Sequence, residues 1–348
     1  MIECHDKSRF DVSALSIGPD DRSQMQQRLR RSFDNFIDID TSSDAAIASR
    51  IRMSEIDILI DLQGFTEHSR TNILAHRPAP IQVNYLGYPG TMGAQCFDYI
   101  IADRYIVPEE LQRCYSEKIV YLPDTFQAND SKRPRPEIVP SRTELGLPED
   151  AFVLCCFNHS YKLTPSIFDI WMRLLRKIDG SVLWILAPNP AAEQNIRREA
   201  ATRGVDSRRI VLAPRVPYED YLARYKRADL FLDTLPFNAG TTASDALWCG
   251  LPVVTCPGET FASRMAGSLL RAAGVPELIA ASLDDYEEIT LRLAYDRTLL
   301  TEIKSRLASQ CIPLFNTELF TRNIETAYAM MHARHRAGLT PDHIVVPH

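Results

Sequence analysis

The segment that most constrains the fold lies around residue 240, where a strand, a polar loop, a helix and a second strand follow one another. Leu230–Leu232 is a short apolar run that predicts a buried strand, and Asp233–Ala239 predicts a loop. Thr241 or Thr242 is a natural N-cap for a helix over Ala243–Trp248. In a parallel sheet, ligands bind in the crevice outside the carboxyl ends of the strands, which is where this loop is expected.

The start of this predicted helix is a candidate phosphate site. A helix N-terminus offers unpaired N–H groups and partial positive charge, both of which suit an anion. Gly240 allows a close approach of the backbone, and Thr241 and Thr242 add two hydroxyl donors. Asp245 lies one turn into the helix, where its carboxylate could accept hydrogen bonds from a ribose diol. These residues indicate a nucleotide diphosphate site, and an ordinary capped helix after a strand is the alternative interpretation.

Strands and helices alternate along the chain, which predicts an α/β fold with mainly parallel sheets. Val182–Leu186 predicts a strand, and Ser166–Lys177 predicts an amphipathic helix. Phe126–Arg142 is polar, basic and rich in proline, so we expect a linker there. With 348 residues, the chain is long enough for two domains. We expect an N-terminal lobe over residues 1–140, a C-terminal lobe over 141–317, and a C-terminal helix with an irregular tail over 318–348.

Composition narrows the classes of function. A net charge of −6 disfavours a nucleic-acid-binding surface, and no apolar run is long enough to cross a membrane. The N-terminus lacks the apolar core of a signal peptide, and the eight cysteines form no CxxC motif. We therefore expect a cytoplasmic protein with free thiols. Asp38-Ile39-Asp40 has the DxD form that holds a metal in some sugar-nucleotide enzymes, but a chance match is favoured and no metal site is expected.

Five short motifs follow one another along the chain: Arg77–Gln82, Leu86–Thr91, Phe157-Asn158 with Tyr161-Lys162, Gly240–Thr242 with Asp245, and Pro257–Thr260 with Ala262–Arg264. Together they resemble the catalytic region of the O-linked N-acetylglucosamine transferases, including the bacterial and SPINDLY-like members. The resemblance extends from about Phe10 to Pro347. It implies two Rossmann-like lobes facing a cleft, the GT-B arrangement. It also implies metal-independent, inverting transfer of N-acetylglucosamine from UDP-GlcNAc to Ser or Thr hydroxyls of proteins, without a cofactor.

The resemblance assigns most donor-side roles to the C-terminal lobe. Lys162 would be the catalytic residue, because a cation at the diphosphate stabilises the charge that develops on the departing UDP. Thr241 and Thr242 match the family's phosphate-binding pair, and Asp245 matches its ribose-binding carboxylate. Tyr221 could stack on uracil where the animal enzymes have a histidine, or could be a half-buried helix aromatic. The full donor set is His159, Val216, Tyr221, Arg224, Gly240, Thr241, Thr242 and Asp245.

Two loops of the N-terminal lobe are expected to shape the sugar and acceptor side, through Gly64, Thr66, Gly87, Tyr88, Pro89, Gly90 and Thr91. No residue is assigned as general base. The family's upstream histidine segment and its tetratricopeptide array are missing from the chain, so we expect the N-terminal lobe to be incomplete. Two alternatives stay open. One is the same fold with GDP-fucose or UDP-glucose as donor, and the other is a catalytically weak remnant that binds a UDP-sugar.

Overall fold

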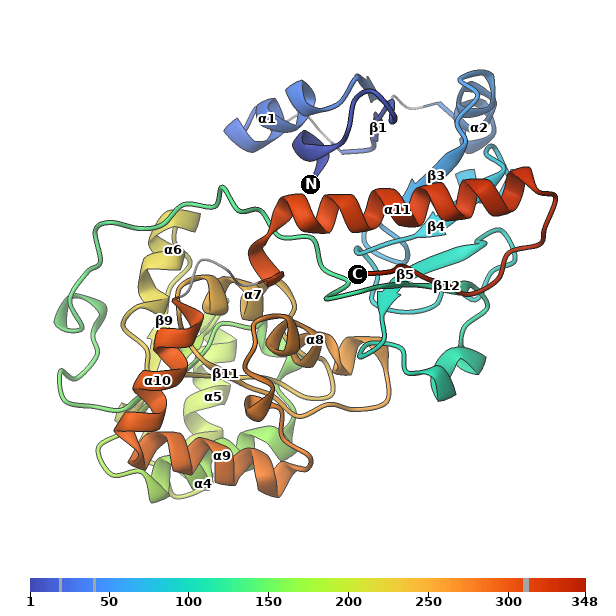
Figure 1. Ribbon diagram of the computed structural model, residues 1–348. Helices are drawn as coiled ribbons and strands as arrows, with labels where there is room; N and C mark the ends of the chain where they lie inside the picture. The colour runs from blue at the N-terminus through green and yellow to red at the C-terminus, as the bar shows by residue number, and fades with distance from the viewer. Residues whose placement is uncertain (19–20, 40–41, 309–312) are drawn as a thin grey trace. The chain divides into compact units, whose positions relative to one another are not determined.

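The computed structural model describes residues 1–18, 21–39, 42–308 and 313–348 (Figure 1). The chain forms two compact units, and each holds a five-stranded parallel sheet, so the expected α/β fold is confirmed. The first unit comprises Met1–Asp130 and Asn316–His348, and the second comprises Ser131–Phe315. These boundaries differ from the expected ones, because residues 131–140 belong to the second unit and the C-terminal helix and tail belong to the first.

The sheet of the second unit has the strand order β11-β10-β7-β8-β9. Numbered along this unit, that order is 3-2-1-4-5 when read from β9, which is the doubly wound Rossmann arrangement. The strands are β7 (Val153–Cys156), β8 (Val182–Leu186), β9 (Ile210–Ala213), β10 (Leu230–Leu232) and β11 (Val253–Val254). Chain connections reverse between β7 and β10, and ligands of such sheets bind at this switch point.

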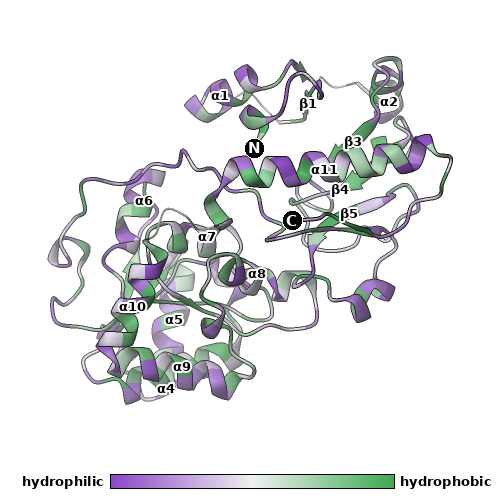
Figure 2. Ribbon diagram, in the orientation of Figure 1, coloured by the Kyte–Doolittle hydropathy of each residue, from purple (hydrophilic) through white to green (hydrophobic). Residues whose placement is uncertain are grey.

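Helices flank this sheet and bury one apolar face each. On α4, Ile167, Trp171 and Leu174 are buried at helical spacing, and Figure 2 shows both hydropathy colours along this helix. The α-helices are α4 (Pro165–Lys177), α5 (Pro190–Thr202), α6 (Tyr218–Tyr225), α7 (Thr241–Trp248), α8 (Met265–Ala272), α9 (Leu283–Tyr295) and α10 (Arg297–Leu307). The 3₁₀ turns are η3 (Thr143–Leu145), η4 (Ser160–Lys162), η5 (Ser207–Arg209), η6 (Phe261–Ser263), η7 (Pro276–Leu278) and η8 (Pro313–Phe315).

The sheet of the first unit has the order β12-β6-β5-β4-β3. Its strands are β3 (Ile58–Asp61), β4 (Ile81–Asn84), β5 (Tyr99–Asp103), β6 (Lys118–Leu122) and β12 (Ile344–Val345), and β1 (Ser13–Ser16) and β2 (Asn35–Asp38) form a separate parallel pair. The helices are α1 (Gln24–Ser32), α2 (Asp44–Met53), α3 (Asn72–Ala75), α11 (Thr317–Arg336), η1 (Ile2–Cys4) and η2 (Glu109–Cys114). The tail expected to be irregular therefore contributes a strand, because β12 pairs with β6.

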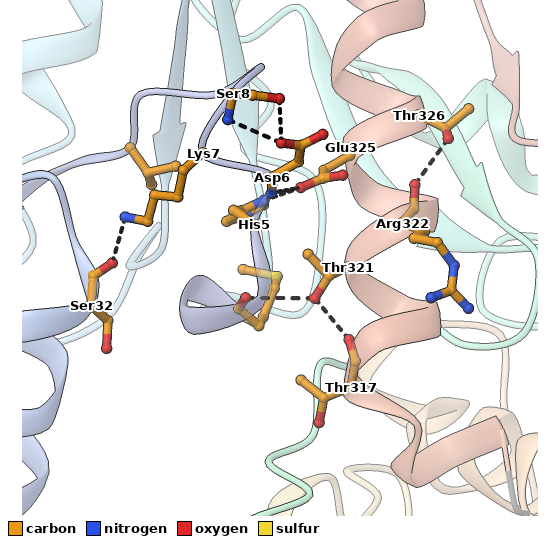
Figure 3. Close-up of polar contacts among 12 residues, drawn as sticks. His5, Asp6, Lys7, Ser8, Ser32, Thr317, Thr321, Arg322, Glu325 and Thr326 are labelled. Carbon is orange, nitrogen blue, oxygen red and sulfur yellow. Dashed lines mark hydrogen bonds and ion pairs between the residues drawn. The ribbon is translucent and has the colours of Figure 1, made fainter.

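The long helix α11 fixes the two ends of the chain to the first unit. Ile324 and Met331 of α11 are buried in one core with Val83 of β4. At the N-terminus, the His5 ring and the Asp6 backbone N–H both contact Glu325 Oε1, at 2.9 Å and 2.8 Å (Figure 3). These contacts explain why the C-terminal helix groups with residues 1–130 rather than forming a separate part.

Seven cysteines in the described part of the chain are free thiols, and Cys155 and Cys156 are buried in β7. Of the DxD motif, Asp38 pairs with Arg30 at 2.7 Å, and Asp40 lies outside the described residues. Within the described ranges, no helix combines the length and the apolar character that crossing a membrane requires.

Candidate functional site

Polar side chains gather at the carboxyl ends of β7 and β10, on either side of the switch point. Asn158 follows β7 and Asp233 follows β10, and both are buried. Asn158 Nδ2 donates to Thr234 Oγ1 at 2.8 Å and lies 3.4 Å from Asp233 Oδ1. The Thr242 hydroxyl donates to Asn158 Oδ1. Asn158 therefore links the end of β7 to the loop after β10 and to the first turn of α7.

Asp233 folds that loop back towards the sheet. Its Oδ1 accepts the backbone N–H groups of Thr234 and Ala239, both at 2.7 Å, and its Oδ2 accepts the Thr255 hydroxyl at 2.6 Å. Burial raises the pKa of this carboxyl to about 6, against the opposing effect of those hydrogen bonds and of the Lys162 charge. Sequence reasoning missed Asp233 as a site residue, although an acid directly after an apolar strand was the signal.

Lys162 is directed at the loop that leads into α7. Its Nζ donates to the backbone carbonyl of Asn238 at 2.9 Å and lies 3.9 Å from the centre of the Phe237 ring. Burial lowers the pKa of the ammonium group, and the Asp233 carboxylate opposes that shift. A cation is thus held next to the start of a helix, where the partial positive charge of the helix also lies.

The helix α7 begins at Thr241, which is one residue earlier than a cap at Thr241 allows and two residues earlier than a cap at Thr242 allows. Gly240 is the N-cap, so the expectation of an N-cap at Thr241 or Thr242 is wrong. The Thr242 hydroxyl does not cap the helix, because it donates a hydrogen bond to Asn158. No side chain caps the first turn of α7. Its N–H groups have no partner within the helix, because no preceding turn offers them carbonyl groups. Such a terminus can accept an anion.

Asp245 lies on the buried side of α7 and is only 2% exposed. Its Oδ1 accepts hydrogen bonds from Arg133 Nη1 and from the Tyr218 hydroxyl, both at 2.9 Å. Burial raises the pKa of Asp245, and the Arg133 charge is the largest opposing influence. Neither Arg133 nor Tyr218 was identified from sequence: Arg133 comes from the proline-rich segment expected to be a linker, and Tyr218 lies among the predicted base-binding residues without having been assigned a role.

The predicted base-binding residues lie on α6 and in the loop before it. The Tyr221 ring is half-buried and stacks against Tyr218, with the ring centres 6.2 Å apart. Arg224 is buried and donates to the Pro214 carbonyl at 2.5 Å, so its guanidinium holds the loop that contains Val216. This arrangement is compatible with both interpretations of Tyr221.

The structure brings α6 and α7 together but leaves His159 apart from them. The Tyr225 hydroxyl donates to the Thr242 carbonyl at 3.2 Å, which joins the two helices. His159 is exposed, and its ring packs on Tyr161 with centres 4.7 Å apart. The donor set thus forms a contiguous group in the second unit around Lys162 and α7, with His159 at its edge.

In the first unit, the two predicted acceptor-side loops follow β3 and β4 and interlock. A Cβ atom added at Gly64 would lie 2.3 Å from Tyr88 Cβ, and one added at Gly87 would lie 1.8 Å from the Leu62 carbonyl oxygen. The rings of Phe65 and Tyr88 meet edge to face at 5.3 Å. These contacts leave room only for glycine at both crossing points.

Further contacts hold the second of these loops. Asn84 Nδ2 donates to the Gly90 carbonyl at 2.9 Å, and the Thr91 hydroxyl donates to Glu117 Oε2 at 2.5 Å. Pro89 is half-buried between them, whereas Thr66 of the first loop is exposed. The structure therefore brings Gly64 of the first loop against Tyr88 of the second within the first unit, and the remaining predicted residues belong to the same two loops.

Among the described residues, no group of three or more His, Cys, Asp or Glu side chains is placed to hold a metal ion. The donor site presents a lysine, a helix terminus and the carboxylate of Asp245, which is paired with Arg133. Metal independence of the reaction stays a prediction.

Comparison with known proteins places the chain in a family. The model of glycosyl transferase family 41 matches residues 1–133 and 127–324. A probable UDP-N-acetylglucosamine–peptide N-acetylglucosaminyltransferase, SEC, from Arabidopsis thaliana is 36% identical over 98% of this chain and 36% of its own length. The UDP-N-acetylglucosamine–peptide N-acetylglucosaminyltransferase of Caenorhabditis elegans is 28% identical over 98% of this chain and 39% of its own length. The chain thus spans little more than a third of these relatives.

Solved structures support the same placement. A mutant O-GlcNAc transferase from Thermobaculum terrenum superposes with a TM-score of 0.88 at 32% identity, over 97% of this chain and 64% of that one. HepE from Anabaena, in complex with UDP and glucose, superposes with a TM-score of 0.61 at 13% identity, over 95% and 94% of the two chains, and shares the fold alone. On the family match over nearly its whole length, the chain belongs to glycosyl transferase family 41.

Proposed function

We propose that the protein is an inverting glycosyltransferase that transfers N-acetylglucosamine from UDP-GlcNAc to Ser or Thr hydroxyls of proteins. The observation that carries the proposal is the position of Lys162, whose Nζ contacts Asn238 in the loop that leads into the uncapped start of α7. The names of the Arabidopsis and Caenorhabditis relatives support the choice of donor and of a peptide acceptor.

In this proposal the diphosphate of the donor binds at the start of α7, against the backbone N–H groups of its first turn. The acceptor hydroxyl attacks the anomeric carbon from the face opposite the diphosphate, the bond from that carbon to the diphosphate oxygen breaks, and the hydroxyl proton passes to water, since no residue is assigned as general base. Negative charge then grows on the leaving UDP. Lys162 stabilises that charge, and it does so without reorganisation because Phe237 and Asn238 already hold its ammonium group.

The nucleoside of the donor would lie over α6 and α7. Asp245 would accept hydrogen bonds from the ribose diol, and the backbone at Val216 would contact uracil near Arg224. The rigid loops around Gly64 and Gly87 in the first unit would shape the sugar and acceptor side. We propose that no metal takes part, since Lys162 and the helix terminus supply the positive charge that the leaving group needs.

The test is a sugar-transfer and UDP-release assay with UDP-GlcNAc, UDP-glucose and GDP-fucose in competition. We expect UDP-GlcNAc to be the preferred donor, and the K162A variant to lose roughly 100-fold or more of kcat, as expected for removal of a group that stabilises transition-state charge. The matched control is K177A, which removes an exposed lysine at the end of α4.

Each alternative has its own result in this assay. Preference for another donor would keep the fold and the role of Lys162 but change the sugar. Tight binding of UDP without transfer or donor hydrolysis would indicate a binding remnant. Unchanged turnover in K162A, with a circular dichroism spectrum like that of the wild type, would remove the observation on which the proposal stands.

A further inference from the structure

The carboxylate of Asp245 is held by a cation from outside the helices that form the site. Arg133 Nη1 lies 2.9 Å from both Ser244 Oγ and Asp245 Oδ1. The ion pair is largely shielded from solvent, with 10% of the Arg133 side chain and 3% of the Asp245 side chain exposed. Pairs of this kind have a large effect on the charge state of the acid, because solvent cannot replace the missing partner.

Arg133 belongs to the linker segment, residues 131–140, which lies along α6 and α7. The Trp248 indole N–H at the end of α7 donates to the Pro134 carbonyl at 3.1 Å. Lys226, which follows α6, donates to the Pro136 carbonyl at 2.8 Å. The segment is therefore anchored to the carboxyl ends of α6 and α7, and the Arg133 side chain is largely shielded from solvent.

Arg133 also lies near the last residue of the second unit. Arg133 lies just after the boundary at Ser131, and its guanidinium carbon is 5.9 Å from the centre of the Phe315 ring, at the other boundary. It lies 6.0 Å from the Trp248 ring, which itself packs edge to face on Phe315. The guanidinium thus lies near two aromatic rings that pack on each other, and it is also held by Asp245.

Both donors to Asp245 use the same oxygen. Arg133 and the Tyr218 hydroxyl bind Oδ1, and in the described part of the chain nothing donates to Oδ2. Among the residues that the structure describes, the other titratable groups around the carboxylate are Tyr221 and Tyr225 on α6 and Cys249 after α7.

The tyrosines Tyr218, Tyr221 and Tyr225 and the thiol of Cys249 carry no charge at neutral pH. Burial raises the pKa of each of the three tyrosines, and raises the pKa of Cys249 to about 12. Among the charged side chains described, Arg133 is therefore the cation that contacts Asp245 and opposes the effect of burial on its pKa.

We propose that Arg133 is a positioning residue of the donor site, which keeps Asp245 ionised and turned so that Oδ2 is available to the ribose hydroxyls of a nucleoside diphosphate. The inference rests on the proposed function, since it concerns how the same site binds its nucleotide. It adds a residue from the linker segment that does not itself touch the ligand. A buried carboxylate without a cation would take up a proton and lose one of its two acceptor sites.

The test is calorimetric titration of the full chain with UDP at about pH 8 and about pH 6. The R133M variant keeps the length of the side chain but removes its charge and its hydrogen bonds. We expect it to weaken UDP binding about tenfold at the higher pH, the loss associated with a hydrogen bond to a charged group. The ratio of its dissociation constant to that of the wild type should grow at the lower pH, because protonation of Asp245 now starts at a higher pH. Taking the ratio cancels the titration of UDP itself.

The matched control is R135M, which removes an exposed arginine of the same segment that stacks on Trp248 at 4.4 Å. We expect the dissociation constant of R135M for UDP to stay close to that of the wild type at both pH values. R133K should recover part of the binding, because lysine restores the positive charge but not the planar guanidinium with its several donors.

Several outcomes would overturn the inference. A wild type that does not bind UDP would remove the proposed function and this inference together. A wild type that binds, with R133M equal to R135M, would overturn the inference alone. A loss in R133M that is identical at both pH values would also overturn it, since a purely structural role would give that result. R133K keeps the test valid if R133M does not fold.

Discussion

Asp233 has no exposed surface, yet its carboxylate accepts the backbone N–H groups of Thr234 and Ala239 in the loop after β10 and the hydroxyl of Thr255. Two of these bonds close the loop that holds Lys162, through Thr234 and Ala239. The geometry at this residue therefore determines where the lysine ammonium lies. Because two of the donors are backbone N–H groups, which cannot accept a proton, the arrangement suits the ionised form despite the cost of burial.

This residue should make the stability of the second unit depend on pH. The carboxyl has a pKa of 3.8 when unperturbed and about 6 in the fold. Between those values the folded chain holds a proton that the unfolded chain has lost, so the free energy of unfolding falls as the pH rises from 4 to 6. The D233N variant has no such group; its Oδ1 can still accept the two backbone N–H groups, and its NH2 group can donate to the Thr255 hydroxyl, which then acts as the acceptor. Relative to D233N, the wild type should lose ~3 kcal/mol over this range.

The measurement is urea unfolding of both proteins at several pH values, with hydrogen exchange in β7 and β10 to follow the second unit. Other titrating groups are common to the two proteins and cancel in the difference. A difference in the free energy of unfolding that stays constant between pH 4 and pH 7 would show that Asp233 does not titrate in this range.

At the scale of elements, the sequence predicts those elements that a short stretch of residues determines by itself. It does not predict those that depend on contacts with distant parts of the chain. β8 lies at the residues predicted for it, Val182–Leu186, because an unbroken apolar run is a local property. β12 was missed because it has two residues and forms only by pairing with β6. The contact of Asn158 with Thr234 could not be predicted from the sequence either, because it requires β7 and β10 to be neighbours in the sheet. The motifs located the lysine and the helix start, but not the side chains that hold them.

The two interlocked loops of the first unit allow a prediction at this scale. In G87A the new methyl group would meet the Leu62 carbonyl at 1.8 Å, so one of the two backbones must move. We expect a loss of more than ~2 kcal/mol in the stability of the first unit, since backbone strain of this kind belongs to the large mutational effects. The matched control is G90A, where the new methyl would meet the movable Tyr88 ring at 3.3 Å.

Urea unfolding, with hydrogen exchange in β3 and β4 as the local probe, would measure both variants. G90A should lose less than ~1 kcal/mol, as is usual where a side chain can adjust. Equal losses in the two variants would mean that the loop after β4 can shift freely away from β3, and the acceptor side would not be preorganised.

For the whole molecule, the two units differ in continuity, because one is built from two separate segments of the chain and the other from a single segment. The first unit is built from Met1–Asp130 and Asn316–His348, so it needs both ends of the chain to complete its sheet and to place α11. The second unit is a single continuous stretch, Ser131–Phe315, with its own core around Trp171 and Trp184. Continuity lowers the entropy cost of bringing its strands together, and a core of its own is what a domain needs to fold alone.

We therefore expect a fragment of residues 131–315 to fold and to bind UDP with an affinity close to that of the full chain. Every residue of the proposed donor site lies within it, including Lys162, Asp245 and Arg133 with its anchored linker segment. The same fragment should not transfer sugar, because the loops around Gly64 and Gly87 belong to the first unit.

Circular dichroism would test whether the fragment folds, and calorimetric titration with UDP would test whether it binds the nucleotide. If the full chain binds UDP and a folded fragment does not, the first unit must supply part of the nucleotide site, and the division of donor and acceptor roles between the units would be wrong.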